Sequence, residues 1–417
     1  MNKIIINGGK RLSGEIKIIG AKNAALPILF STLLTDESTK ITNVPSLTDI
    51  DVAVEFLNFI GKKTIKIDNI VNTFQSKNNY KYIAPYDLVK KMRASILVIG
   101  PLLARLKKAF VSFPGGCSIG DRPIDMHIDA FKKMGAEIFI KNGYIEAFAN
   151  DGLKGANINL KIQSVGVTEN ILLSSVLADG VTVITNASCE PEVEDLINVL
   201  NSMGAKIIRQ KTKKIVINGV KKLNGFNHRL IPDRIEAATY IIASAITKGE
   251  IFVKNVIPNH LRIILEKLKK SGLYIEETEN VIHAKWTNNL CPQNIKTEVY
   301  PGFPTDVQAQ WMVLMSLVDG ESFIEENIFE NRFMHVAELK RLGANIYING
   351  KVVKINGVTK FSGAQVMMSD IRAGAALVLA GLAAEGKTII SRVYHLDRGY
   401  YMFEENLQRL GADIMRI

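Results

Sequence analysis

Six glycines recur along the chain at nearly constant spacing, and this repeat limits the possible folds more than any other feature. Successive members are 74, 69, 68, 71 and 68 residues apart: Gly61, Gly135, Gly204, Gly272, Gly343 and Gly411. A bulky apolar residue lies four positions before each glycine: Leu57, Phe131, Leu200, Leu268, Leu339 and Leu407. Isoleucine follows three positions after five of them, and Thr64 follows the first. Because glycine readily adopts the left-handed conformation that ends helices, each repeat predicts an amphipathic helix, a glycine cap and a strand.

The segment Pro191–Met203 shows the expected helix clearly. Its apolar residues form one stripe at helical spacing: Val193, Leu196, Ile197, Leu200 and Met203. Its polar residues are expected to face away from that stripe: Glu192, Glu194, Asp195 and Asn198.

Short β-rich runs opened by glycine precede most of these helices, at Gly180, Gly249, Gly320 and Gly386. Helices and strands therefore alternate throughout, which predicts an α/β or α+β protein of six similar units. A chain of 417 residues exceeds the usual size of a single hydrophobic core. Three units per domain would give two domains of similar size, and the pattern leaves open whether the units close into barrels or stack.

The composition of the chain argues against nucleic-acid-binding and membrane-spanning proteins. The net charge is +11, but the lysines are scattered and form no long basic tract, so a solvated basic surface is favoured over nucleic-acid binding. The longest apolar runs, at 95–104 and 373–384, are shorter than the roughly 20 residues that span a bilayer. Three cysteines without metal-ligand spacing and an N-terminus without a signal-peptide core favour a cytoplasmic protein.

The segment from Pro114 to Arg122 places Cys117 in a glycine-rich turn, five residues before an arginine. Glycine allows close approach of the backbone to a ligand, and a nearby guanidinium group favours the reactive thiolate. The residues alone leave two interpretations open, a reactive thiol or a glycine loop with an incidental cysteine.

Further motifs resemble those of one enzyme family. They are Lys22-Asn23 within Gly-Ala-Lys-Asn-Ala-Ala-Leu-Pro, the cysteine loop leading into Arg122-Pro-Ile-Asp-Met-His127, Pro301-Gly-Phe-Pro-Thr-Asp306-Val-Gln-Ala-Gln310, Glu330-Asn-Arg-Phe-Met-His335, Ser369-Asp-Ile-Arg-Ala373 and Asp397-Arg-Gly-Tyr400. Together they resemble the UDP-N-acetylglucosamine enolpyruvyl transferase (1-carboxyvinyltransferase) family across nearly the whole chain.

This resemblance implies a two-domain inside-out α/β barrel of six βαβαββ-type units, three per domain, with helices inside and sheets outside. One discontinuous domain would comprise residues 1–19 plus 232–417 and carry Asp306 and Arg398. The other would comprise residues 20–231 and carry Lys22 and the Cys117 loop. The active site is expected in the cleft between the two.

The family's reaction moves the enolpyruvyl group of phosphoenolpyruvate to the 3-hydroxyl of the sugar in UDP-N-acetylglucosamine, without a metal or redox cofactor. The resemblance implies that Cys117 donates a proton and is the position alkylated by fosfomycin-type epoxides, while Asp306 is the candidate base. It also implies that phosphoenolpyruvate is held by Lys22, Asn23, Arg122 and Arg398. Lys22 is expected just before a largely apolar helix over 24–34, where anions bind favourably.

The resemblance also implies which residues bind the UDP-sugar. They are Arg93, Arg122, Pro123, Ile124, Asp125, Met126, Ser164, Val165, Gly166, Asp306 and Ile328. Further cleft positions are Arg332, Asp370 and Arg372. The chain departs from many relatives at Ile162, where they carry lysine, so a phosphate contact from that position is not expected here.

Three alternatives stay open at this point. Without the resemblance, Asp306 would more often be an ordinary helix-capping residue. The sibling enzyme that uses shikimate 3-phosphate shares the fold, although the cysteine loop and the motif around Arg122 favour the UDP-sugar. An inactive nucleotide-sugar binding protein would be expected to have lost Lys22, Cys117, Asp306 or Arg398, and all four are present. His127 and His335 are expected to be packed, hydrogen-bonded residues.

Overall fold

The computed structural model describes residues 2–74, 80–113 and 124–417, and the chain divides into two compact units. The C-terminal unit comprises residues 2–19 and 232–417, and the central unit comprises residues 20–113 and 124–231. The described strands form six four-stranded sheets, three in each unit. Every sheet contains one parallel pair followed by two antiparallel pairs, so the six units share one topology.

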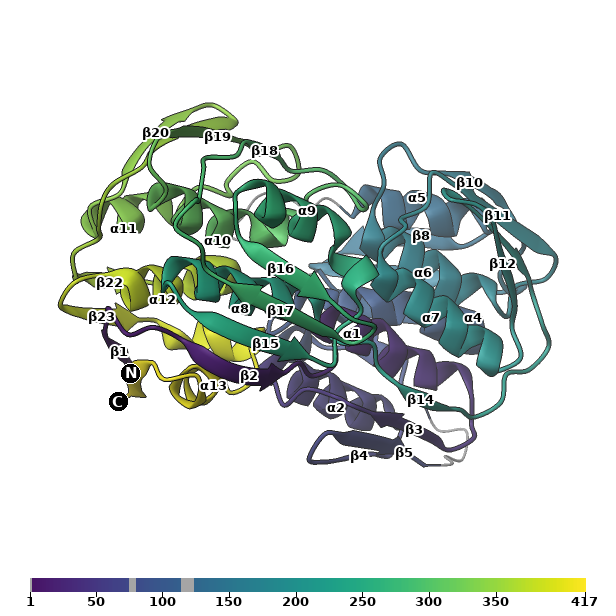
Figure 1. The fold of residues 1–417 in the computed structure, drawn as a ribbon. Coiled ribbons are helices and arrows are strands. Elements are labelled where there is room, and N and C mark those ends of the chain that lie inside the picture. Colours follow the sequence, from purple (N-terminus) through teal and green to yellow (C-terminus); the bar gives the residue numbers. More distant parts are fainter. Residues whose placement is uncertain (1, 75–79, 114–123) are drawn as a thin grey trace. The chain divides into compact units, whose positions relative to one another are not determined.

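The sheets of the C-terminal unit have the orders β22-β23-β1-β24, β16-β17-β15-β2 and β18-β19-β21-β20 (Figure 1). Their strands are β1 Ile4–Asn7, β2 Ser13–Lys17, β15 Glu250–Lys254, β16 Tyr274–Glu277, β17 Val281–Lys285, β18 Ile295–Lys296, β19 Glu321–Glu325, β20 Asn345–Asn349, β21 Val352–Asn356, β22 Gln365–Met367, β23 Lys387–Ser391 and β24 Asp413–Arg416. The N-terminal strands β1 and β2 thus complete two sheets whose other strands come from the C-terminal half.

The sheets of the central unit have the orders β14-β3-β5-β4, β6-β7-β9-β8 and β10-β11-β13-β12. Their strands are β3 Thr39–Thr42, β4 Thr64–Ile67, β5 Ile70–Thr73, β6 Ile83–Ala84, β7 Lys108–Ser112, β8 Glu137–Lys141, β9 Tyr144–Phe148, β10 Asn157–Asn159, β11 Val181–Thr185, β12 Lys206–Lys211, β13 Lys214–Asn218 and β14 Asn227–Arg229. Strand β14 closes this unit by pairing in parallel with β3.

Six helical segments form the interior of the two units. They are α1 Lys22–Ser31, extended by η1 Thr32–Leu34; α4 Ile99–Leu106, preceded by η2 Arg93–Val98; α6 Val165–Ser175; α8 Arg234–Ile246; α10 Thr305–Ser316; and α12 Ile371–Ala383. Most of their residues are buried, as expected for helices that are apolar on all sides. In Figure 1 the strands of the C-terminal unit lie outside α8, α10 and α12, and α10 packs against both neighbours.

The amphipathic helices each pack against the strand that follows them in the chain. They are α2 Thr48–Ile60, α5 Asp125–Lys133, α7 Pro191–Ser202, α9 Arg262–Lys270, α11 Val336–Arg341 and α13 Phe403–Arg409. Short helical turns complete the chain: α3 Tyr86–Val89, η3 Pro258–Leu261 and η4 Val393–Arg398.

The predicted glycine caps are confirmed. All six glycines have φ between 89° and 113°, the left-handed region. The residue after each glycine donates its N–H to the carbonyl oxygen of the apolar residue four positions before that glycine, at 2.9–3.1 Å. This is the Schellman arrangement. The glycine-opened strands are also confirmed, as β11, β15, β19 and β23.

One prediction about α7 was partly wrong. Glu192 and Asp195 are 4% and 3% exposed, although the helical pattern placed both away from the apolar stripe. Asp195 accepts hydrogen bonds from His228 Nε2 at 2.9 Å and from the backbone N–H of Ile231 at 3.4 Å. Because β14 and the residues after it return to this side of α7, Asp195 is buried, whereas Asn198 of the same polar set stays exposed.

A glycine directly after β21, β13 and β1 lies very close to the backbone of another segment, so a larger residue there is expected to be destabilising. A Cβ at Gly357 would lie 1.8 Å from the carbonyl oxygen of Val318, and Gly219 and Gly8 have equivalent contacts with Ala178 and Ala384 at 1.7 Å and 2.1 Å. Gly357→Ala is expected to destabilise the C-terminal unit by about 3 kcal/mol, since backbone must move. Gly343→Ala meets nothing within 4 Å and is expected to cost only about 1 kcal/mol of left-handed strain. Thermal unfolding of both variants checks this, and equal midpoints would contradict it.

Candidate active site

Many of the site residues predicted from the sequence, where the structure describes them, lie at or next to the first turns of the buried helices. Lys22 and Asn23 open α1, Ser164 caps α6 through a contact with the N–H of Val167 at 3.4 Å, and Asp306 is the second residue of α10. Asp370 caps α12, and Arg93 opens the 3₁₀ turn that leads into α4. Helix N-termini present free N–H groups and a positive dipole end, which suits anionic substrates. The chain repeats one structural unit and places polar residues at the same point in each.

The Asp306 carboxylate is held between two arginines. Its Oδ1 accepts a hydrogen bond from Arg332 Nη2 at 2.7 Å, and its Oδ2 accepts one from Arg372 Nη2 at 3.1 Å. The Asp306 side chain is 28% exposed, whereas those of Arg332 and Arg372 are 3% and 7% exposed. The carboxylate therefore has two fixed cationic partners and an accessible edge. This arrangement favours the functional interpretation of Asp306 over the capping one.

The two arginines are held by their own surroundings. Arg332 lies beside Phe329, with Cζ 5.4 Å from the ring centroid. Burial disfavours the charged form of Arg372, but the charges of Asp306 and Asp233 and the hydroxyl of Tyr400 outweigh burial and raise its pKa above the ordinary value. Sequence reasoning placed Arg332 and Arg372 near the site without identifying Asp306 as their partner.

Asp370 caps the N-terminus of α12. Its Oδ1 accepts hydrogen bonds from the backbone N–H groups of Arg372 and Ala373 at 2.9 Å and 3.0 Å. Such N-caps stabilise helices by about 1 kcal/mol. Asp370 thus fixes the first turn of α12, from which the Arg372 side chain reaches Asp306.

Lys22 forms a buried ion pair in the central unit. Its Nζ lies 3.1 Å from Asp49 Oδ2, and the two side chains are 10% and 4% exposed. Asn23 is exposed beside it. Helix α1 begins at Lys22 itself, two residues earlier than predicted, because Ala21 supplies the N-cap position. Asp49 was not identified from the sequence, since no local pattern links it to a lysine 27 residues away.

Several residues of the expected UDP-sugar set lie close together in the central unit. The charge of Arg93 acts on His127, and an added Cβ at Gly166 would lie 3.8 Å from the His127 ring. Ile124 is buried directly before α5, which Asp125 and Met126 open. Val165 is the first residue of α6, and Ile162 precedes this helix with 67% exposure.

The remaining predicted residues divide between the C-terminal unit and the undescribed segment. Ile328 donates its N–H to Glu326 Oε1 at 2.9 Å. Arg398 ends η4, and both its charge and that of Asp370 act on the pKa of His395. Cys117, Arg122 and Pro123 lie outside the described residues.

The two motif histidines are packed, as predicted. Asn170 Nδ2 and His127 Nδ1 are 3.1 Å apart, and His335 interacts with the backbone of Arg332. Burial lowers the pKa of both imidazoles to about 4; Arg93 also lowers that of His127, whereas Asp370 opposes the shift at His335.

Acid sensitivity of both units follows from these shifts. The unfolded histidines bind protons below about pH 6.5, whereas the folded ones remain neutral until about pH 4. The contribution of the two neutral histidines to the free energy of unfolding is therefore fully present above pH 6.5. It is lost as the pH falls toward 4, by on the order of 3 kcal/mol for each histidine. Thermal midpoints between pH 7 and 4.5 check this. His335→Gln is expected to flatten the decline, and an unchanged slope would count against the assignment.

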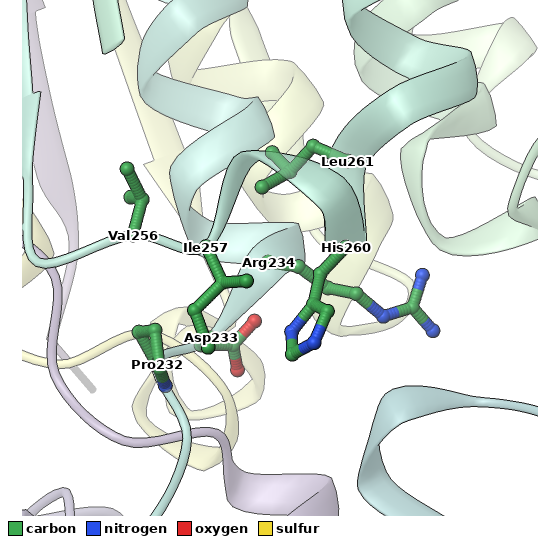
Figure 2. A pocket seen from close by; sticks show the side chains of 7 residues that line it. All are labelled: Pro232, Asp233, Arg234, Val256, Ile257, His260 and Leu261. Carbon is green, nitrogen blue, oxygen red and sulfur yellow. The ribbon is translucent and has the colours of Figure 1, made fainter. Parts of the chain in front are cut away.

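A small pocket lies at the start of α8 (Figure 2). It is lined by Pro232, Asp233, Arg234, Val256, Ile257, His260 and Leu261. Asp233 Oδ1 accepts from the N–H groups of Ile235 and Glu236 at 2.9 Å and 3.0 Å. Sequence reasoning missed Asp233 and Arg234. Their position at the start of a buried helix, where Asp370 caps α12 in the same way as Asp233 caps α8, was the available signal.

The described residues contain no group of three or more His, Cys, Asp or Glu side chains that could hold a metal ion. None of the helices within 2–74, 80–113 and 124–417 is long and apolar enough to cross a membrane.

The chain is similar to known proteins along its whole length. The EPSP synthase (3-phosphoshikimate 1-carboxyvinyltransferase) family matches residues 6–407. UDP-N-acetylglucosamine 1-carboxyvinyltransferase of Endomicrobium trichonymphae is 65% identical over 414 residues, covering 99% of both chains. The enzyme of the same name from Desulfosudis oleivorans is 52% identical and covers 100% of both chains.

Solved structures agree on the fold. The enolpyruvyl transferase NikO from Streptomyces tendae matches with a TM-score of 0.90 at 23% identity, covering 100% of this chain and 98% of that one. EPSP synthase from Acinetobacter baumannii matches with a TM-score of 0.78 at 19% identity, covering 100% of both. At these identities the likeness concerns the fold alone, and it confirms the predicted fold class. With the curated relatives at 65% and 52% identity, the chain belongs to the UDP-N-acetylglucosamine 1-carboxyvinyltransferase family of EPSP synthase-like enolpyruvyl transferases.

Proposed function

We propose that this chain transfers the enolpyruvyl group of phosphoenolpyruvate to the 3-hydroxyl of the sugar in UDP-N-acetylglucosamine and releases phosphate. This is the first committed step of peptidoglycan precursor synthesis. The observation that carries the proposal is 65% identity over 99% of the chain to an enzyme named for this activity. The function, enzyme class and substrates inferred from the motifs are confirmed at this level.

The roles of individual residues are a further part of the proposal. The sugar hydroxyl loses its proton to Asp306 as its oxygen bonds to C2 of phosphoenolpyruvate, while C3 gains a proton from the Cys117 thiol. Loss of a C3 proton and cleavage of the C2–O bond to phosphate then restore the double bond. Because Asp306 is anchored by Arg332 and Arg372, its accessible edge is suited to a hydrogen bond with the hydroxyl.

Cations must hold the phosphate and carboxylate charges through both steps. We assign this to Lys22, Arg122 and Arg398, with Asn23 beside Lys22. Arginine forks match carboxylate and phosphate oxygens, and lysine supplies a compact charge. The proposal thus requires Lys22 of the central unit and Asp306 and Arg398 of the C-terminal unit to act on the same reactants, with each unit forming one domain of the enzyme.

The UDP-sugar contacts are proposed for residues of both units, mainly Arg93, residues 122–126, residues 164–166 and Ile328. The exposed Ile162 supplies no charge, so a phosphate contact there is not part of the proposal. We further propose a cytoplasmic location, where both anionic substrates would be available, and no role in nucleic-acid binding.

A product assay with two acceptors tests the function. The purified chain is supplied with phosphoenolpyruvate and either UDP-N-acetylglucosamine or shikimate 3-phosphate, and phosphate release and product mass are followed. Release of phosphate with a product heavier than the UDP-sugar by one enolpyruvyl group is expected only with the first acceptor. Turnover of shikimate 3-phosphate would favour the sibling activity, and turnover of neither would favour an inactive binding protein.

A further inference from the structure

Tyr400 and Gln310 belong to the motifs of the chain, yet the proposed chemistry gives them no task. Tyr400 follows η4 and is 3% exposed, and Gln310 lies one turn after Asp306 on α10 and is fully buried. Burying such polar groups is costly unless they are hydrogen-bonded. Their contacts therefore indicate what they are retained for.

Both residues meet at Thr239 of α8. Gln310 Nε2 lies 3.0 Å from Tyr400 OH, 3.1 Å from Thr239 Oγ1 and 3.1 Å from the backbone oxygen of Asp306. Thr239 donates its single hydroxyl hydrogen to the carbonyl oxygen of Ile235 at 2.8 Å. The 3.0 Å contact between Tyr400 OH and Thr239 Oγ1 must therefore run from tyrosine to threonine. This direction leaves the lone pairs of the Tyr400 oxygen available as acceptors.

The Tyr400 side chain also lies against Arg372. The guanidinium Cζ is 5.4 Å from the centroid of the Tyr400 ring, a cation–π distance. Burial raises the pKa of Tyr400, although Arg372 opposes this shift, so the phenol stays neutral at physiological pH. Arg372 Nη2 bonds to Asp306 Oδ2, and within the described part of the chain its buried Nη1 has no hydrogen-bond partner. Besides its ion pair with Asp306, this guanidinium interacts with both the ring and the hydroxyl of Tyr400, so Tyr400 is placed to orient it.

The network connects the three core helices of the C-terminal unit around one carboxylate. Thr239 comes from α8, Gln310 and Asp306 come from α10, and Arg372 comes from α12. Groups that orient a functional side chain through an intermediate residue can change rates strongly, since small displacements misalign reacting atoms.

We propose that Tyr400 is a positioning residue for the transfer reaction, which orients Arg372 and through it the Asp306 carboxylate. Gln310 and Thr239 fix the Tyr400 hydroxyl in the direction that this requires. The inference rests on the proposed role of Asp306 and extends it to residues that do not touch the substrates.

Tyr400→Phe tests the inference by removing the hydroxyl while keeping the ring. We expect kcat to fall about tenfold, with KM for both substrates changed by less than about twofold. A guanidinium partner favours the ionised carboxylate, so a less well-ordered Arg372 is expected to move the acid limb of the kcat–pH profile to higher pH. Tyr347→Phe, on the exposed side of β20, is the matched control and is expected to behave as the unaltered enzyme.

Thr239→Val provides a second test if the tyrosine variant folds poorly. It removes the acceptor of the Tyr400 hydrogen, and a kcat decrease of about threefold with the same shift of the acid limb is expected. An unchanged kcat and pH profile in either folded variant would overturn the inference while leaving the function intact. Near-normal activity of Asp306→Asn would instead refute the proposed role of Asp306 itself.

Discussion

Asp306→Asn is expected to reduce kcat about 1,000-fold, the range that a general base contributes to a reaction. Asparagine keeps the size and shape of aspartate, but its amide cannot take the proton of the sugar hydroxyl. The variant is expected to fold, because the asparagine carbonyl can still accept from Arg332 or Arg372. A thermal midpoint lowered by a few degrees is expected, since two buried guanidinium groups lose their charge partner.

The measurement is steady-state phosphate release at saturating substrates, together with UDP-N-acetylglucosamine binding by calorimetry. Asp319→Asn is the matched control, because Asp319 is exposed just beyond the other end of α10. It is expected to leave kcat unchanged. A variant Asp306→Asn that retained a rate within about threefold of the unaltered enzyme would exclude Asp306 as the base.

Cys117→Ser is expected to lower kcat at least about 100-fold, within the range for loss of a general acid. A serine hydroxyl is a far weaker acid than a thiol and does not readily give its proton to carbon at neutral pH. Cys117→Asp supplies a different acid and is expected to work only at lower pH, where its carboxyl group is protonated. The pH dependence of these variants separates proton donation from a role in product release.

Two controls accompany the cysteine variants. Cys189→Ser changes a half-buried thiol whose Sγ lies 3.0 Å from the carbonyl oxygen of Thr212, and normal turnover is expected. A fosfomycin-type epoxide is expected to add its mass to the unaltered enzyme and not to Cys117→Ser. Normal turnover of Cys117→Ser would rule out the thiol as the proton donor.

The repeat of helix, glycine and strand could be predicted from the sequence because its signals are local. A glycine that ends a helix and an apolar residue four positions earlier act within one turn, and Gly204 with Leu200 shows both in the structure. The same holds for β11, which follows Gly180 directly.

Contacts between distant segments could not be predicted in this way. Asp49 pairs with Lys22, and Arg372 reaches Asp306 from 66 residues away. The burial of Asp195 depends on a residue 33 positions further on, His228. These pairs depend on which helices and strands pack together, which periodicity along a single segment does not specify. Motif resemblance located Asp306 and Arg372, but only the fold identified their mutual contact.

Deuterium incorporation tests the proposed reaction most directly. In D₂O the Cys117 thiol carries deuterium, so addition would convert C3 of phosphoenolpyruvate transiently into a partly deuterated methyl group. Elimination would then leave deuterium in the vinyl methylene of the product, which mass spectrometry detects. This label is expected in the product of the unaltered enzyme with UDP-N-acetylglucosamine. Full turnover to an unlabelled enolpyruvyl product would contradict it.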